Sequence, residues 1–284
     1  MPSSFSPLRY PGGKSQLYDY VKRIIDYNDL LGETYVEPFA GGAGLAMKLL
    51  LNNDVKRIII NDYDFAIYSI WYCILNYTDD FCDRIQQIDI SIEEHDRQRT
   101  IYNSGTTNIF DMGIAAFYLN RTNRSGVIKG GVIGGREQGG LYKIDARFNK
   151  DALIKKIRAI AKEKGRIVLY NLDAMDFLSN GVLDHYYKTF VNFDPPYVIK
   201  GSQLYKNAFS EQDHKDLYKL ISKCKRKWIV TYDICPLIRE LYKKHRGAEI
   251  DINYSASNSG KAREYIFFSN NLFIPKGIEL TNQS

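Results

Sequence analysis

Short apolar runs alternate with longer segments of helical periodicity along most of this chain. The runs are rich in Val, Ile, Tyr and Phe, and several stop at Pro, Asn or Asp, which is typical of buried strands. An alternating pair of segments near Glu249–Tyr254 and Glu264–Ser269 predicts an antiparallel hairpin close to the C-terminus. The other predicted strands are Thr34–Val36, Arg57–Ile60, Ile167–Tyr170, Phe190–Phe193 and Trp228–Thr231.

The segments between these strands predict helices packed on a mostly parallel sheet. Apolar residues recur at helical spacing over 17–25, over 45–50, from Tyr68 to Tyr118 and from Asp151 to Lys164. Strand and helix alternate before and after residues 77–165, but that segment contains no strand-like run. The sequence therefore predicts an α/β fold in which residues 1–76 and 166–284 form one domain and residues 77–165 form an inserted module.

One tetrapeptide, Asp194-Pro195-Pro196-Tyr197, directly follows the predicted strand Phe190–Phe193. Two consecutive prolines fix two φ angles and remove two backbone donors, so carbonyl oxygens remain as acceptors beside a carboxylate and an aromatic ring. A flat molecule with an amino group suits this arrangement, because its ring can stack on Tyr197 while its N–H groups meet Asp194 and the Pro195 carbonyl. Adenine is such a molecule. The alternative interpretation is an ordinary turn that leaves a strand.

A glycine-rich turn follows the first predicted strand. The sequence Glu37-Pro38-Phe39-Ala40-Gly41-Gly42-Ala43-Gly44 leads into a helical segment, and the second strand ends in Asn61-Asp62, where an acid can bind the hydroxyls of a ribose. These features indicate a cofactor that contains adenosine. The turn is not a full Gly-x-Gly-x-x-Gly, and no strand is followed by a Gly-Lys-Ser/Thr phosphate loop. A cofactor without phosphates explains both absences.

Composition excludes several classes of protein. The chain has 284 residues, of which 44% are hydrophobic and 25% are charged, as expected for a globular protein. No apolar stretch approaches the roughly 20 residues that cross a bilayer, and Met1–Arg9 lacks the apolar core of a signal peptide. We therefore expect a soluble, cytoplasmic protein with no membrane partner. The four cysteines and four histidines do not cluster, so we expect neither disulfides nor a bound metal.

Positive charge is concentrated in one segment. The net charge is +6, yet residues 120–166 contain thirteen Lys and Arg against four Asp and Glu, which is 13 − 4 = +9 and leaves −3 for the rest. The helical part of this segment has the pattern of a solvated helix with lysines opposite its apolar face. The part before that helix interleaves cations with glycines, which favours a flexible loop or hairpin that follows phosphates and enters grooves. Its cations are Arg121, Arg124, Lys129, Arg136, Lys143 and Arg147.

In this order, the motifs resemble those of the D12 class of DNA adenine-N6 methyltransferases, the group that includes the Dam enzymes. Residues 10–14 (Tyr-Pro-Gly-Gly-Lys) are similar to the family's methionine-binding motif, and residues 36–44 are similar to its cofactor loop. Asp62 lies where the family has its ribose-binding acid, and residues 194–197 resemble its catalytic tetrapeptide. Phe117-Tyr118-Leu119-Asn120-Arg121 and the basic stretch after it resemble the start of the family's target-recognition region. The resemblance covers nearly the full length.

The resemblance implies a Rossmann-like, S-adenosylmethionine-dependent methyltransferase fold interrupted by a target-recognition domain. It implies site-specific transfer of a methyl group from S-adenosylmethionine to N6 of an adenine flipped out of duplex DNA. Asp194 and the Pro195 carbonyl would accept the two N6 hydrogens and stabilise the positive charge that moves to nitrogen. Lys14 would meet the methionine carboxylate, and the Tyr10 ring would face the sulfonium. The resemblance implies the cofactor-binding residues Tyr10, Gly13, Lys14, Glu37, Pro38, Phe39, Gly41, Gly44, Asp62, Asp173 and Asp194, and no metal ligand.

Some of these assignments compete with structural roles. Core packing is the alternative for Tyr10 and Phe39, and a turn or helix cap is the alternative for Asp173. Arg124 and Arg136 are the candidates for reading bases, and phosphate contact is the alternative for every cation. Lys261 and Arg263 lie in the loop predicted between the last two strands. The candidate DNA-binding residues are Asn120, Arg121, Arg124, Lys129, Arg136, Arg147, Lys261 and Arg263.

The target sequence stays open, because residues 122–142 do not align with the recognition hairpin of GATC-specific members. A cognate restriction endonuclease acting on the same site is a possible partner of such an enzyme. Three other functions compete with this one: a methyltransferase for protein glutamine or RNA, a DNA-binding regulator without activity, and a nicotinamide-dependent oxidoreductase. Asp194 stands where the glutamine-modifying enzymes usually have Asn, and a regulator would have no use for Asp62 and Tyr197. The incomplete glycine pattern disfavours the oxidoreductase.

Overall fold

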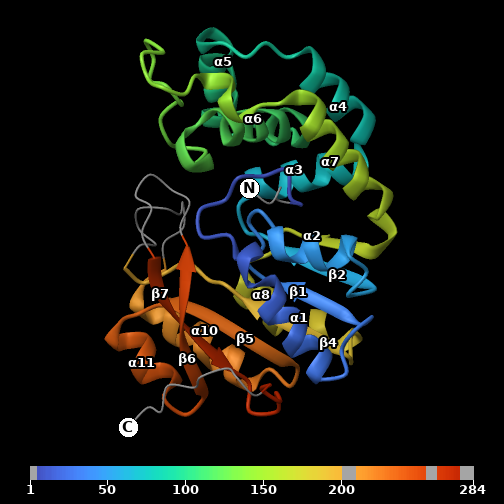
Figure 1. Cartoon of the computed structure of the whole chain (residues 1–284), viewed down its shortest axis with the longest axis vertical. Coiled ribbons are helices and arrows are strands. Elements are labelled where there is room, and N and C mark those ends of the chain that lie inside the picture. The colour runs from blue at the N-terminus through green and yellow to red at the C-terminus, as the bar shows by residue number, and fades with distance from the viewer. Residues whose placement is uncertain (1–4, 200–208, 254–260, 276–284) are drawn as a thin grey trace.

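The computed structural model describes residues 5–199, 209–253 and 261–275, and its centre is a seven-stranded sheet with the order β3-β2-β1-β4-β5-β7-β6 (Figure 1). Strands β1 to β5 are parallel, and β7 is antiparallel to both of its neighbours, β5 and β6. The strands are β1 Thr34–Glu37, β2 Arg57–Asn61, β3 Ile167–Tyr170, β4 Thr189–Phe193, β5 Lys227–Asp233, β6 Arg246–Asn253 and β7 Lys261–Phe268. The predicted α/β class with a mostly parallel sheet and a C-terminal antiparallel hairpin is confirmed.

One prediction at the end of the chain is wrong. Lys261 and Arg263 lie within β7, where they pair with Asn253 and Asp251 of β6, and not in a loop before the last strand. The backbone ladder extends past the apolar residues that mark the strand in the sequence. Cross-strand hydrogen bonds are available to any residue with an N–H group, so polar residues can prolong a strand beyond its buried part.

Helices connect the strands and cover the sheet. The α-helices are α1 Tyr18–Tyr27, α2 Gly44–Leu51, α3 Phe65–Asn76, α4 Thr78–Gln87, α5 Ile92–Asn103, α6 Ile109–Thr122, α7 Lys150–Lys162, α8 Ala174–Ser179, α10 Glu211–Lys223 and α11 Pro236–Tyr242. Short 3-10 helices are η1 Lys14–Leu17, η2 Arg124–Gly126, η3 Ile144–Arg147, η4 Lys164–Arg166 and η5 Val182–His185.

Both faces of the sheet are buried, as the continuous apolar runs predicted. On β1, Tyr35 belongs to the core that includes α1, α2 and α3, whereas the next residue, Val36, belongs to the core that includes α8, α10 and α11. The strands β2 and β4 divide their residues in the same way. Successive side chains of a strand point to opposite faces, so the apolar residues of these short strands contribute alternately to the two cores.

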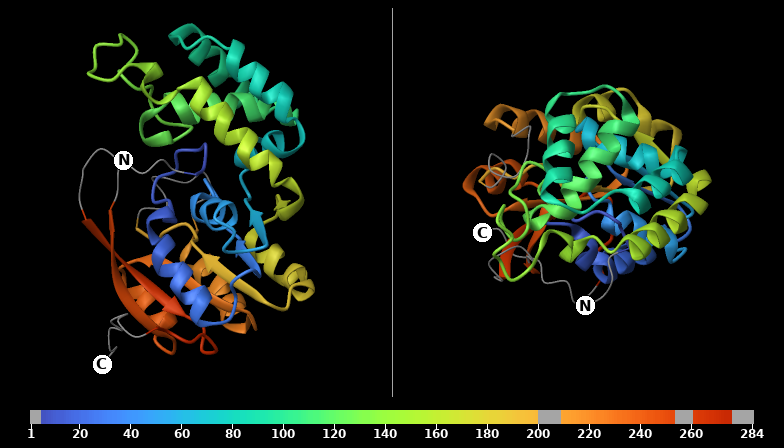
Figure 2. Two further views of the ribbon diagram at one scale, coloured as in Figure 1. Left: turned by 45° about the vertical axis from the view of Figure 1, so that its right-hand side comes forward. Right: turned by 90° about the horizontal axis from the view of Figure 1, so that it is seen from above.

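Helices α4 to α7 form a helical layer that lies beyond α3, away from the sheet (Figures 1 and 2). Its side chains belong to the same hydrophobic core as α1, α2 and one face of the sheet, with Phe81, Phe117 and Ile157 fully buried. Helices α4 to α7 are therefore joined to the sheet through a shared core that includes α3. This continuity gives the helical layer a fixed position over the carboxyl ends of β1 and β4, where an α/β sheet binds its ligands.

Candidate active site

A cavity of about 870 Å³ opens at the carboxyl ends of β1, β2 and β4, between the sheet domain and the helical layer. Five of its acidic lining residues follow or end strands of the sheet, namely Glu37, Asp62, Asp64, Asp173 and Asp194, and a sixth, Asp213, lies on α10. Its cationic lining residues other than Lys14 come from the N-terminal loop and from the helical layer. The cavity therefore has an acidic end and a basic end, and a bound molecule with separated charges would be oriented by this difference.

The glycine-rich turn between β1 and α2 forms the floor of the acidic end. Gly41 has φ +46°, and a Cβ atom at this position would lie 2.6 Å from the ring of Tyr10, so only glycine fits beneath that ring. Ala43 is also left-handed, with φ 43°, and immediately precedes α2. Tyr10 is half-buried and lines the cavity with its ring against this turn. Tyr10 can both pack in the fold and contact a ligand, because one face of its ring lies on the turn and the ring also lines the cavity.

Asp62, at the end of β2, is held by two backbone amides. Its Oδ2 accepts a hydrogen bond from Gly41 N (2.7 Å), and its Oδ1 accepts one from Asp64 N (2.9 Å). Burial raises the pKa of Asp62 to about 7, and these two amides oppose the shift. The amides fix the carboxylate against the glycine turn, and each oxygen keeps acceptor capacity for a hydroxyl of a ligand. This arrangement suits the predicted contact with a ribose.

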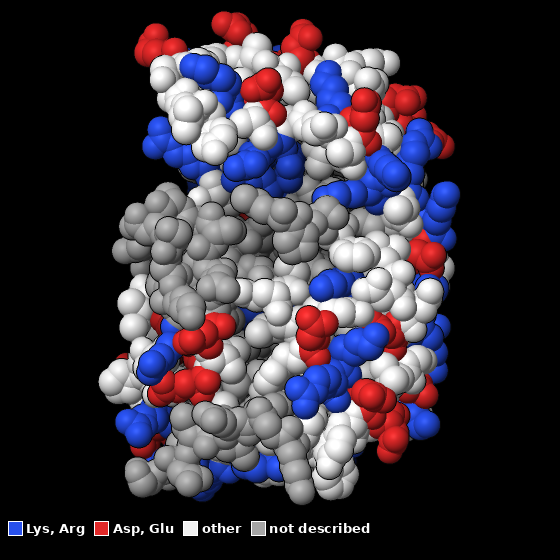
Figure 3. Space-filling model, viewed as in Figure 1, with Lys and Arg blue, Asp and Glu red and all other residues white. Residues whose placement is uncertain are grey.

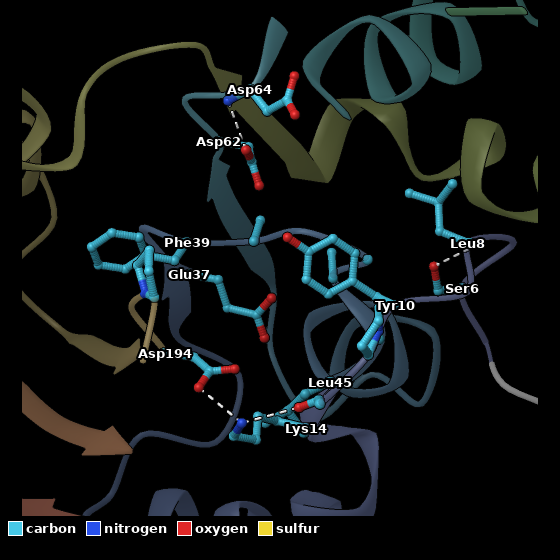
Figure 4. A pocket seen from close by; sticks show the side chains of 18 of the residues that line it. Ser6, Leu8, Tyr10, Lys14, Glu37, Phe39, Leu45, Asp62, Asp64 and Asp194 are labelled. Atoms are coloured by element: carbon cyan, nitrogen blue, oxygen red, sulfur yellow. Dashed lines mark hydrogen bonds and ion pairs between the residues drawn. The ribbon is translucent and has the colours of Figure 1, made fainter. Parts of the chain in front are cut away.

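Glu37 is the other buried acid of this end, and its carboxyl group points into the space between Tyr10 and Asp194 (Figure 4). Its Oε1 accepts hydrogen bonds from the Tyr35 hydroxyl (2.9 Å) and from Ala46 N (3.2 Å). Burial raises the pKa of Glu37 to about 8, and the nearby Asp194 carboxylate adds to the shift. The folded protein therefore favours the protonated form of Glu37 at neutral pH.

This shift predicts a loss of stability with rising pH. An acid with a raised folded pKa contributes stability that is fully present below its unfolded pKa, near 4.5, and lost as pH rises through about 8. We expect Glu37→Gln, which stays neutral, to lose less unfolding free energy than the wild type between pH 5 and pH 9. Urea unfolding of both proteins without cofactor at several pH values tests this. Asp62 also has a raised pKa, so Asp62→Asn is measured in the same way as a control. Equal slopes of unfolding free energy against pH for the wild type and Glu37→Gln would contradict the assignment.

Lys14 holds Asp194 at the centre of the cavity. Its ammonium lies 2.8 Å from Asp194 Oδ1 and 3.5 Å from Glu264 Oε2, and it donates to the hydroxyl of Tyr197 (2.8 Å) and to Gly12 O (3.0 Å). Lys14 and Glu264 are almost fully buried, with side-chain exposures of 4% and 1%. The prediction for Lys14 was contact with the methionine carboxylate. In the structure the Lys14 ammonium pairs with the motif carboxylate and with Glu264, a residue that the sequence motifs did not indicate, and contact with a methionine carboxylate stays a prediction.

Two further residues fix the motif after β4. Thr231 on β5 donates to Asp194 Oδ1 (2.9 Å), and Asp233 at the end of β5 accepts hydrogen bonds from Val198 N (3.1 Å) and Ile199 N (2.7 Å). The parallel pairing of β4 with β5 brings these side chains beside the motif. Neither residue has a sequence signal of its own. Thr231 and Asp233 could be connected with the motif only after the order of the strands was known.

The ring of Tyr197 is buried beside the motif carboxylate, and its stacking on a ligand stays a prediction. Its ring is 5% exposed and packs against Tyr232, with 6.5 Å between the ring centroids. Its hydroxyl accepts from Lys14 and lies 3.4 Å from Asp194 Oδ1. Asp194 and Pro196 line the cavity, whereas Pro195 is buried. In this conformation the ring of Tyr197 supports the carboxylate from behind, because its hydroxyl is held by Lys14.

The other predicted cofactor residues lie around the same cavity. Gly13, Pro38, Phe39 and Gly44 line it, and the Phe39 ring makes an edge contact with Phe209. Asp173 also lines it, and its Oδ1 accepts from Met175 N (2.8 Å) as the N-cap of α8. The helix-cap alternative for Asp173 is therefore realised. The fold thus brings together one loop before α1, the turn after β1 and the ends of β2, β3 and β4.

The family model that matches this chain is that of the D12 class N6 adenine-specific DNA methyltransferases, over residues 10–255. The chain belongs to this class. The match includes each sequence motif described above, from the loop before α1 to β6. The earlier resemblance to this family, and the assignment of the protein as an adenine-specific DNA methyltransferase, are confirmed.

Relatives of this D12 methyltransferase have low sequence identity. The Type II methyltransferase M.CviBI of Paramecium bursaria Chlorella virus NC1A is 23% identical over 258 residues, which cover 87% of this chain and 90% of the relative. The Type II methyltransferase M.MjaIII of Methanocaldococcus jannaschii is 22% identical over 223 residues, which cover 74% of each chain. Among solved structures, a SAM-dependent methyltransferase from Agrobacterium tumefaciens is similar with a TM-score of 0.41 and 10% identity, over 90% of this chain and 61% of that one.

One of the DNA-binding residues predicted for this D12 methyltransferase has a structural role. Asn120 is fully buried, and its Nδ2 donates to Arg9 O (2.6 Å) and Gly126 O (2.8 Å) while its Oδ1 accepts from Arg9 N (2.9 Å). The amide has both of its donors and its acceptor engaged, so it cannot serve DNA in this conformation. It joins the N-terminal loop to the glycine-rich segment. The segment after it is a loop with a single bridge, between Asn123 and Val132, and not a hairpin.

The predicted cations of the methyltransferase lie in different surroundings. Arg121 and Arg147 line the cavity. Arg124 and Lys129 are exposed outside it, and neither makes an ion pair with a residue that the structure describes. Arg136 makes a bidentate ion pair with Asp96 of α5 (2.7 and 2.8 Å), and Arg263 is 3.5 Å from Glu249. The side chain of Lys261 lies outside the described part of the chain. Figure 3 shows Lys and Arg gathered on the margin of the helical layer that borders the sheet domain.

No helix among the described residues is long and apolar enough to cross a membrane. The four cysteines all lie in the described part of the chain and are free thiols. Three of them are buried: Cys73, Cys82 and Cys235.

Proposed function

We propose that this protein transfers the methyl group of S-adenosylmethionine to N6 of an adenine that has been flipped out of duplex DNA at a specific site. One observation supports this most directly: the Asp194 carboxylate lies in a cavity whose sheet end is acidic and whose helical end is basic. The acidic end suits a cationic cofactor without phosphates, and the basic end suits a nucleic acid. A nicotinamide dinucleotide is disfavoured, because its pyrophosphate would lie beside the carboxyl groups of Asp62 and Asp64.

The residues of the acidic end fit the chemistry of S-adenosylmethionine. When bound, this cofactor supplies an electrophilic methyl group on a positively charged sulfur. Asp62 would accept hydrogen bonds from the ribose hydroxyls, and the Gly41–Gly44 turn would allow close approach of the backbone. Tyr10, with its ring on the cavity wall, would face the sulfonium. Glu37 and Asp173 would complete the acidic wall around the cofactor.

Asp194 would act on the adenine amine. The hydrogen bonds and the ion pair that Asp194 makes with described residues all fall on Oδ1, from Lys14, Thr231 and Tyr197. We assign Oδ2 to the N6 amine and the Pro195 carbonyl to its second hydrogen. Acceptance of both hydrogens frees the nitrogen lone pair from the ring and stabilises the positive charge that develops on nitrogen. Pro196, on the cavity wall, offers an apolar surface for the base.

The domain division also belongs to this proposal. Residues 1–76 and 166–284 would form the catalytic domain, and residues 77–165, which include helices α4 to α7, would form the target-recognition domain. A cognate restriction endonuclease that cuts the same site would be a partner. We place the enzyme in the cytoplasm, where such a nuclease and the DNA meet.

The test is a filter assay with methyl-labelled S-adenosylmethionine and unmodified duplex DNA. We expect label in DNA, recovery of N6-methyladenine after digestion, and no label in protein or RNA offered in parallel. Sequencing of DNA from cells that express the protein, with detection of modified adenines, would then give the target site. Absence of label in DNA with the folded wild-type protein would overturn the proposal.

A further inference from the structure

Helix α5 contacts the segment after α6 at three points, and we call residues 123–136 of this segment the basic loop (Figure 1). The contacting side chains of α5 are His95, Asp96 and Arg99, which share one face of the helix. Their partners in the loop are 28 to 40 positions away in the sequence. No sequence motif indicated any of the three, so these contacts are a product of the tertiary structure.

Arg99 holds the backbone on both sides of Lys129. Its Nη1 donates to Ile128 O (3.0 Å), and its Nη2 donates to Gly130 O (2.7 Å). Burial lowers the pKa of Arg99, so its hydrogen bonds to the loop offset part of its lost hydration. A planar guanidinium holds two acceptors in a set geometry. The peptide groups that flank Lys129 are therefore fixed, and its exposed side chain starts from a set backbone position.

His95 holds the backbone next to Arg124, and it does so through Asn123. Its Nε2 lies 2.8 Å from Asn123 Oδ1. The Nδ2 of Asn123 donates to Val127 O (3.1 Å) and to Ile128 O (2.7 Å). Because these two carbonyls use the amide nitrogen, the amide oxygen faces the imidazole, and His95 Nε2 is the donor. His95 and Asn123 are both buried, so the exposed Arg124 follows a fixed residue.

Asp96 makes the third contact, at the surface. It accepts hydrogen bonds from Nη1 (2.8 Å) and Nη2 (2.7 Å) of Arg136. The two side chains are 47% and 62% exposed. A guanidinium that is paired through both terminal nitrogens has a fixed orientation. Each of the three α5 residues therefore fixes a different cation of the basic loop or the backbone beside it.

The basic loop has a shape that such contacts maintain. Ser125 has φ 56°, in the left-handed region that a residue with a side chain seldom occupies. The loop is closed by one isolated bridge, between Asn123 and Val132, and not by a strand ladder. Backbone groups without a ladder open more easily than those of core strands. The donors and the acceptor of α5 therefore help to select one conformation of the loop.

We propose that His95, Asp96 and Arg99 are positioning residues for target discrimination, which hold the basic loop in the shape in which it reads the site. This inference rests on the proposed function. None of the three lines the cavity that contains Asp194, so they act through the loop and not on the reacting base. A contact with a base edge needs a side chain that starts from a fixed backbone, whereas a flexible cation can follow a phosphate without one. A preset loop also loses little freedom at the correct site and cannot adapt to a wrong one.

The test measures discrimination between two duplexes. Once the target site is mapped, kcat/KM is measured on that site and on a site with one base pair other than the target adenine changed. Arg99→Met removes the donors and keeps an unbranched side chain, and it should lower the ratio of the two kcat/KM values about tenfold. Its kcat on the target duplex should stay within about threefold of the wild type. Arg99→Lys, which keeps a cationic donor, should have an intermediate ratio.

A second variant and a matched control accompany Arg99→Met. Asp96→Asn changes an exposed pair and should lower the ratio about threefold. If Arg99→Met does not fold, the ratio for Asp96→Asn decides. Arg97→Met is the control, because Arg97 lies on the same helix, pairs with Glu94 of that helix and makes no described contact with the basic loop. It should leave the ratio within about twofold.

Hydrogen exchange of the free proteins tests the positioning itself. In Arg99→Met, the amides of residues 123–133 should exchange about tenfold faster than in the wild type, and in Arg97→Met they should not. A variant that is merely less stable loses activity equally on both duplexes, so an unchanged ratio would overturn the inference even with faster exchange. Unchanged exchange would overturn it as well. If the wild type labels no DNA, the proposed function fails and this inference fails with it; if it labels DNA and the ratio is unchanged, only this inference fails.

Discussion

Replacing Asp194 by Asn is expected to lower the rate of methyl transfer to DNA by about 100-fold to 1000-fold. The amide keeps the size of the carboxylate but has one donor group and no negative charge, so it cannot accept both the Lys14 ammonium and an N–H of the adenine amine equally well. Single-turnover transfer of a labelled methyl group measures the chemical step directly. The reduced rate should persist at saturating DNA and saturating cofactor.

Binding must be measured in the same variant, because Asp194 also borders the predicted cofactor site. We expect the Kd for S-adenosylmethionine, measured by calorimetry, to change by less than tenfold. Asp213→Asn is a control on the same cavity wall: its carboxylate accepts from Ser210 in the capping box of α10, away from the motif. It should retain most of the activity. A rate for Asp194→Asn within tenfold of the wild type would contradict the catalytic role.

Replacing Lys14 by Met is expected to lower the free energy of unfolding by about 3–5 kcal/mol, because removal of one partner leaves buried charges uncompensated. The substitution removes the ammonium that lies 2.8 Å from Asp194 and 3.5 Å from Glu264 while it keeps most of the side-chain volume. Methyl transfer should also fall strongly, since the motif carboxylate loses its main contact. Urea unfolding followed by circular dichroism gives the stability change.

A surface pair provides the matched control for Lys14. Lys56 is 57% exposed and lies 2.7 Å from Glu33, so Lys56→Met should cost no more than about 1 kcal/mol. The double variant Lys14→Met with Glu264→Gln should be more stable than Lys14→Met alone, because it no longer buries two acids beside each other. A single variant Lys14→Met as stable as Lys56→Met would show that the buried cluster does not stabilise the fold.

Much of the sheet could be predicted from local patterns. The strand predictions succeeded because both faces of the sheet are buried, which makes runs such as Ile58–Ile60 apolar at every position. The end of β7 was misplaced for the opposite reason, since Arg263 takes part in the ladder without burial. The glycine turn after β1 was also recognisable, because Gly41 supports a positive φ beneath the ring of Tyr10.

The partners of the site residues could not be predicted in the same way. Lys14 was assigned to a cofactor carboxylate by its motif, yet its ammonium is shared by Asp194 and Glu264, which are 180 and 250 positions away. Asn120 was assigned to DNA because it stands beside a basic segment, yet its amide holds the backbone of Arg9. A motif indicates which chemistry a residue type can perform, and the partner depends on which distant segment the fold brings beside it.

The sequence alone determined the family and the α/β class, and it placed the candidate motifs at the carboxyl ends of predicted strands, because strand burial, a glycine turn and a proline-rich motif are local properties of the chain. Only the tertiary structure decided that Lys14 pairs with both the motif carboxylate and Glu264, and that Arg9, Arg121, Arg147 and Lys156 line one cavity. Electrostatic interactions depend on distances in space and on burial, and neither quantity is recorded in the spacing of residues along the chain.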